Sequence, residues 1–81
     1  MLPAEITAVE RQLAFCRRNL NMAQTGLISQ SSARTQLRIS LSVLEHLGER
    51  RDLDSLHRQA RQLVFDEIIG YMEEQGWIFG R

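Results

Sequence analysis

The residues of this chain that are equipped for nucleophilic or metal chemistry are one cysteine, Cys16, and two histidines, His46 and His57. A metal site requires three or four ligands, usually at short fixed spacings such as Cys-x-x-Cys. These three residues fall on three different predicted helical segments and show no such spacing. Cys16 also occupies an apolar helix position, where burial favours the neutral thiol. The sequence therefore predicts no metal site, no catalytic thiol and no cofactor.

Two pairs of adjacent acidic residues, Asp66-Glu67 and Glu73-Glu74, are the remaining candidates for acid–base catalysis. Neighbouring residues of a helix point about 100° apart, so neither pair brings its carboxyl groups together to share a proton. The five glycines are isolated along the chain rather than gathered in a phosphate-binding loop. We therefore expect a protein that is not an enzyme.

One segment, residues 23–38, resembles the turn and recognition helix of bacterial helix-turn-helix proteins. In those proteins a small residue ends the first helix, an apolar residue follows the turn, and a polar helix start faces the major groove. The resemblance implies that Ile28 packs inward. The residues that it places near bases or phosphates are Ser29, Gln30, Ser32, Arg34 and Arg38. A small DNA-binding transcriptional regulator is therefore our alternative prediction of function.

The overall charge and composition are those of an ordinary globular domain. Ten basic and ten acidic residues cancel, so the chain lacks the net positive charge that most nucleic-acid binders use. All ten basic residues are arginine, a usage typical of GC-rich bacterial or phage genomes and well suited to paired contacts. No apolar run reaches membrane-spanning length, and the first residues lack the order of a signal peptide. We expect a cytoplasmic protein with a reduced cysteine and no membrane contact.

The apolar pattern predicts three helices in a single domain covering residues 1–81. The first helix begins near Pro3 and ends at Gly26. Its apolar seam repeats every three or four residues, as in a coiled coil: Ile6, Val9, Leu13, Cys16, Leu20 and Ala23. Phe15 lies off this seam with Arg11 and Arg18 beside it. We interpret this second face as a packing surface for another helix or a second subunit.

Residues 25–32 are polar and predict a loop that ends in a serine N-cap. The second helix is predicted from Ala33 to Leu47, with Gly48 as its C-cap. Its main apolar face consists of Leu37, Leu41, Leu44 and Leu47. Ile39 and Val43 widen the apolar arc to about half of the circumference, which is typical of a helix between two neighbours.

The third helix is predicted to begin after Asp52 or Asp54 and to continue to about Gln75. Its expected core face consists of Leu53, Leu56, Ala60, Leu63, Val64, Ile68 and Tyr71. A second apolar stripe is formed by Phe65, Ile69 and Met72, and an apolar tail by Trp77, Ile78 and Phe79. Gly70 inside this helix indicates either a close helix crossing or a tolerated glycine.

Together these patterns predict an all-α fold, a long antiparallel helical hairpin with a third helix packed on it. The surplus of apolar helix surface favours a protein–protein interaction module, of the regulator, adaptor or co-chaperone type, that also binds itself as a homodimer or larger assembly. The predicted partner-binding residues are Phe65, Ile69, Met72, Trp77, Phe79, Phe15, Arg11 and Arg18. The pattern leaves open whether the Phe65 stripe belongs instead to the core of the monomer.

Overall fold

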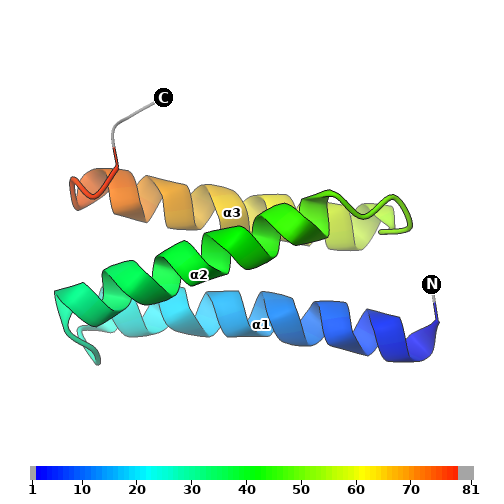
Figure 1. Ribbon diagram of the computed structural model, residues 1–81, viewed down its shortest axis with the longest axis horizontal. Helices are drawn as coiled ribbons and strands as arrows, with labels where there is room; N and C mark the ends of the chain where they lie inside the picture. The colour runs from blue at the N-terminus through cyan, green and yellow to red at the C-terminus, as the bar shows by residue number, and fades with distance from the viewer. Residues whose placement is uncertain (1, 79–81) are drawn as a thin grey trace.

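Three helices joined by two short connections make up residues 2–78, the part of the chain that the computed structural model describes (Figure 1). Helix α1 spans Pro3–Thr25, α2 spans Gln30–Gly48 and α3 spans Ser55–Glu74. The predicted all-α, three-helix fold is confirmed.

The helices run up, down and up again. Helices α1 and α2 form the predicted antiparallel hairpin, as shown by the bond from Arg50 to Glu5 at its open end and the contact from Cys16 to Ser40 near its middle. Helix α3 returns in the same direction as α1, and its Tyr71 hydroxyl donates to the Ala23 carbonyl at 3.2 Å. In Figure 1, α2 crosses diagonally between the other two helices. The Cα atoms extend over 38 × 27 × 16 Å.

The first connection is tighter than the sequence predicts. Gly26 takes a left-handed conformation with φ 74°, and the amides of Gly26 and Leu27 bond back to the last turn of α1. Helix α2 then begins at Gln30, three residues before the predicted start, because the Ser29 hydroxyl accepts the amide hydrogen bond of Ser32 at 3.2 Å. The N-cap is therefore the first serine of the segment, and the connection shrinks to residues 26–29.

The core lies along the three-helix axis. On α1 the predicted seam is confirmed from Val9 onward, with Val9, Leu13, Cys16, Leu20 and Ala23 all buried, whereas Ile6 is half-buried. Helix α2 contributes Ala33, Leu37, Leu44 and Leu47, whereas Leu41 of the predicted face is half-buried and Ile39 is 49% exposed. Two buried polar residues, Asn19 and Ser40, were not expected from the apolar pattern.

The buried face of α3 differs from the predicted one. Leu56 and Leu63 were expected in the core, but 77% and 53% of their surfaces are exposed. Met72 was assigned to a separate stripe, but it is only 1% exposed and lies in the core with Val64 and Ile68. The core face is therefore rotated toward α2 relative to the prediction, because α3 packs against α1 and α2 at once.

Asn19 and Ser40 connect α1 to α2 inside this core. The Asn19 side-chain amide donates to the Ser40 hydroxyl at 2.9 Å, and that hydroxyl donates to the Gln36 carbonyl at 3.0 Å. The Cys16 thiol lies 3.6 Å from the Ser40 carbonyl oxygen. Since an unpaired buried polar group costs free energy, these bonds favour one register of the hairpin over its neighbours.

We expect Ser40→Ala to lower the free energy of unfolding by about 1–3 kcal/mol, because it leaves the Asn19 amide buried without its acceptor. The double variant Asn19→Leu with Ser40→Ala removes both polar groups and should recover most of that loss. Urea unfolding followed by circular dichroism measures both, with the exposed Ser42→Ala as the control on the same helix. A double variant as unstable as Ser40→Ala would contradict this account.

Among the glycines within residues 2–78, Gly48 is the one with close neighbours, although its predicted role was that of a C-cap. Helix α2 ends at Gly48, and Glu49 in a right-handed conformation caps it. A Cβ atom at Gly48 would lie 2.8 Å from Cζ of Arg61, whose Nε donates to the Leu44 carbonyl at 2.8 Å. The same guanidinium lies 5.0 Å from the centre of the Phe65 ring. At Gly70, by contrast, a Cβ would meet nothing within 4 Å, so no close crossing occurs there.

We expect Gly70→Ala to raise the free energy of unfolding by about 0.5–1 kcal/mol, through the helix propensity of alanine. Gly48→Ala should give no such gain, because its methyl group displaces Arg61 from the Leu44 carbonyl. In an Arg61→Ala background, Gly48→Ala should become stabilising. Urea unfolding of the four variants measures this, and an equal gain from Gly48→Ala in both backgrounds would contradict it.

Candidate functional site

The residues suited to nucleophilic or metal chemistry remain separate in the structure. Cys16 is fully buried, and burial raises the pKa of its thiol, which keeps it protonated at neutral pH. His46 lies on the outer surface of α2, and His57 lies in the first turn of α3. Between residues 2 and 78, no group of three or more histidine, cysteine or acidic side chains is placed to hold a metal ion.

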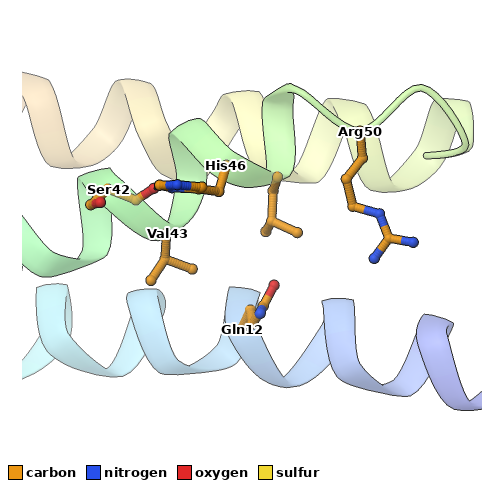
Figure 2. A pocket seen from close by; sticks show the side chains of 6 residues that line it. Gln12, Ser42, Val43, His46 and Arg50 are labelled. Carbon is orange, nitrogen blue, oxygen red and sulfur yellow. The ribbon is translucent and has the colours of Figure 1, made fainter.

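A shallow polar recess of about 430 Å³ lies between α1 and α2 (Figure 2). Its lining residues are Gln12, Ser42, Val43, His46, Leu47 and Arg50. The His46 ring lies along α2, with its Nδ1 bonded to the Ser42 carbonyl at 2.8 Å rather than to the serine hydroxyl. This geometry does not activate Ser42, because a nucleophilic serine needs its hydroxyl hydrogen-bonded to the base.

A second groove, more apolar than the recess, lies between α1 and α3, and we call it the α1/α3 groove. Its volume is about 450 Å³, and none of its lining residues comes from α2. They are Glu10, Leu13, Ala14 and Arg17 from α1, with Leu56, His57 and Ala60 from α3. Helix periodicity explains the set, since residues 10, 13, 14 and 17 share one face of α1. The floor of the groove is apolar and its rim carries both signs of charge.

Leu56 lines this groove from α3, and Leu63 lies about two turns further along the same helix. They are seven residues apart, so they project from nearly the same side of the helix as Ala60 between them. Their 77% and 53% exposure makes this the surplus apolar surface of α3. The apolar pattern predicted these leucines in the core rather than on the surface. Their exposure could have been predicted from their angular offset from Ile68 around the helix. That offset is informative only once Ile68 is known to be the centre of the buried face.

His57 closes one end of the α1/α3 groove. Its Nδ1 lies 2.7 Å from Oδ2 of Asp54, and its Nε2 lies 3.7 Å from Oε2 of Glu10 on α1. The hydrogen bond with the Asp54 carboxylate raises the pKa of His57, and the nearby Glu10 acts in the same direction. In turn, bonds from the His57 amide and ring hold the pKa of Asp54 below its usual value.

The predicted partner-binding residues are dispersed over the structure. Met72 is buried, and Phe65 and Trp77 are half-buried against the core, where Trp77 packs edge-on to Tyr71 at 5.8 Å. Ile69 is also half-buried. Phe79 lies outside the described residues. Phe15, 40% exposed, shares the outer surface of α1 with Arg11 and Arg18. Much of the stripe formed by Phe65, Ile69 and Met72 therefore packs into the monomer core. Less of its surface is accessible to a partner than the sequence predicted.

Residues 23–38, which resemble a helix-turn-helix motif in sequence, are arranged differently from that motif in the structure. Ile28 packs against the core, and Ser29 serves as the N-cap of α2. The exposed side chains of this segment include Gln30, Ser32, Arg34 and Arg38. However, α1 and α2 run side by side as a hairpin, whereas the two helices of the motif meet at about 90–120°. The DNA-binding hypothesis stays a prediction that this arrangement does not strengthen.

No family model, no curated protein and no solved structure matches this chain. None of the three helices between residues 2 and 78 combines the length and apolar character needed to cross a membrane.

The raised pKa of His57 predicts a pH-dependent contribution to stability. Because the folded protein binds this proton more tightly than the unfolded chain, the contribution is complete below about pH 6.5, the ordinary histidine pKa. It is lost as the pH rises through the higher folded value. Asp54 remains ionised throughout this range.

We therefore expect the melting temperature of the wild-type protein to exceed that of His57→Gln by more at pH 5.5 than at pH 8.5. Thermal unfolding followed by circular dichroism at the two pH values measures the difference, with His46→Gln as the matched control. An advantage over His57→Gln of the same size at both pH values would show that the charged form of His57 adds nothing.

Proposed function

We propose that this protein is a non-catalytic protein–protein interaction module that packs its α1/α3 groove against the apolar helix surface of a partner. The observation that carries the proposal is the 77% exposure of Leu56, which lines this largely apolar groove, together with the exposed Leu63 seven residues further along α3. Docking of amphipathic helices on such a surface is a common mode of recognition.

The chemistry of the groove supports a protein ligand over a small polar one. Its floor consists of Leu13, Ala14 and Ala60, which offer contact surface and no hydrogen bonds from their side chains. The polar groups, Glu10, Arg17 and His57, lie around this apolar floor. An apolar centre with a polar rim is the usual composition of a protein interface. The small alanines allow a bound helix to approach the backbone closely.

The leucines have no role in the monomer that accounts for their position. Burying one such side chain in an interface contributes about 1.5–3 kcal/mol. Leu56 and Leu63 together therefore offer a substantial part of the free energy of a specific complex, at little cost to the stability of the monomer. Interfaces depend on a few residues of this kind at their centre.

Site-specific photo-cross-linking in the cells that produce the protein tests this proposal. A benzophenone amino acid replaces Leu56, and we expect a discrete protein adduct after irradiation. The same amino acid at Thr35, an exposed position on α2, is the control and should give no adduct. Adding Leu63→Glu should lower the adduct yield at position 56 by about tenfold or more, because a charge then occupies the apolar edge.

The matched control for Leu63→Glu is Thr35→Glu, which should leave the adduct yield at position 56 unchanged. Absence of an adduct at position 56, or equal yields at positions 56 and 35, would overturn the proposal that the α1/α3 groove binds protein.

A further inference from the structure

We infer that the occupant of the α1/α3 groove is a second copy of this chain, related by a two-fold axis that crosses both helices at right angles near Ala14 and Ala60. This inference rests on the proposed function and names the partner of the same site. In this dimer, α1 packs antiparallel on α1 of the partner and α3 packs antiparallel on α3 of the partner. The four helices then pack face to face, and the Leu56 side chain that lines each groove is buried between them.

The charges of α1 are arranged for this symmetry. Glu10 and Arg17 both line the groove, and the midpoint between them along the chain falls between Leu13 and Ala14. An antiparallel copy centred at that midpoint places each Glu10 opposite Arg17 of the other chain. Because the operation is two-fold, the single sequence pair yields two intermolecular ion pairs. Glu10 keeps 63% of its side chain exposed, and Arg17 makes no ion pair within residues 2–78.

Leu56 and Leu63 of α3 are also paired by this two-fold axis, at the same height along the molecule. The midpoint of Leu56 and Leu63 falls beside Ala60, so an antiparallel copy places each Leu56 against Leu63 of the other chain. The contact between Glu10 and His57 shows that residue 10 of α1 is level with residue 57 of α3. The midpoint between Glu10 and Arg17 is therefore level with Ala60. One axis therefore satisfies the charges of α1 and the leucines of α3 together.

The centre of this arrangement is also shaped for close approach. Ala14 on α1 and Ala60 on α3 both line the groove at the level of the axis. Each would meet its own symmetry mate, and small side chains there let the paired helices come near one another. The seven-residue separation of Glu10 and Arg17 on one face of α1 favours the perpendicular axis, because that axis places each of them opposite the other across the interface.

The inference is tested by charge reversal on the purified full chain at pH 8, with the dimer dissociation constant measured by sedimentation equilibrium. Glu10→Arg places arginine opposite Arg17 at both contacts, and Arg17→Glu places glutamate opposite Glu10. Each single reversal should raise the dissociation constant about tenfold, since it turns two attractive pairs into two repulsive ones. The double reversal in one chain should restore the wild-type value.

A mixture of the two single variants gives the most specific outcome. A heterodimer of Glu10→Arg with Arg17→Glu has opposite charges at both contacts, so it should form in preference to either homodimer. The controls with matched changes of charge are Glu45→Arg and Arg38→Glu on the exposed surface of α2, which should leave dimerisation unchanged. Circular dichroism melts verify that every variant is folded.

A wild-type protein that remains monomeric to high micromolar concentration overturns the dimer. In that case an adduct between position 56 and a different protein would leave the proposed function standing, whereas no adduct at all would end both. A dimer that ignores the reversals of Glu10 and Arg17 but dissociates with Leu63→Glu would overturn the antiparallel arrangement alone.

Discussion

The register between α1 and α2 determines the rest of this structure. It is held by a seam of small and medium apolar side chains, within which Asn19 donates to Ser40 and the Cys16 thiol approaches the Ser40 carbonyl. An apolar seam alone tolerates a shift by one helical turn, since leucine replaces leucine at small cost. A buried amide does not tolerate such a shift, because it would lose its acceptor. The polar contact thus converts an adaptable hairpin into one with a single alignment.

Once the hairpin is aligned, the path of α3 is restricted by polar contacts at its two ends. Arg58 donates to the carbonyls of Arg50, Arg51 and Leu53, which ties the second connection to the start of α3. At the other end, Tyr71 bonds to the Ala23 carbonyl beside the first turn. Three arginine side chains each donate several hydrogen bonds to groups of the same chain: Arg50, Arg58 and Arg61. This use explains part of the preference for arginine, whose planar group satisfies more than one carbonyl or carboxylate at a time.

The position of α3 also decides which apolar surface is left over. A helix that touches two neighbours buries one broad face, and on α3 that face is centred on Ile68. Phe65 and Met72 fall on the α2 side of it, whereas Leu56 and Leu63 fall beyond the α1 side. In a chain of 81 residues the core is small, so surface that cannot be covered internally is a substantial fraction of the whole. The α1/α3 groove is the consequence, and its lining combines apolar side chains with charges of both signs.

The sequence by itself determined the number and type of the helices, the buried seam of α1 and the burial of Cys16. These depend on local periodicity and on residues such as Pro3, Gly26 and Asp54 at helix ends, whose effects act within one or two turns. It did not separate the true N-cap Ser29 from the serines after it, because each is able to cap and the choice depends on how far α2 must reach. Only the tertiary structure decided which arc of α3 is buried. The apolar residues of α3 are spread over about two thirds of its circumference, so periodicity admits several core faces, and the neighbouring helices select one.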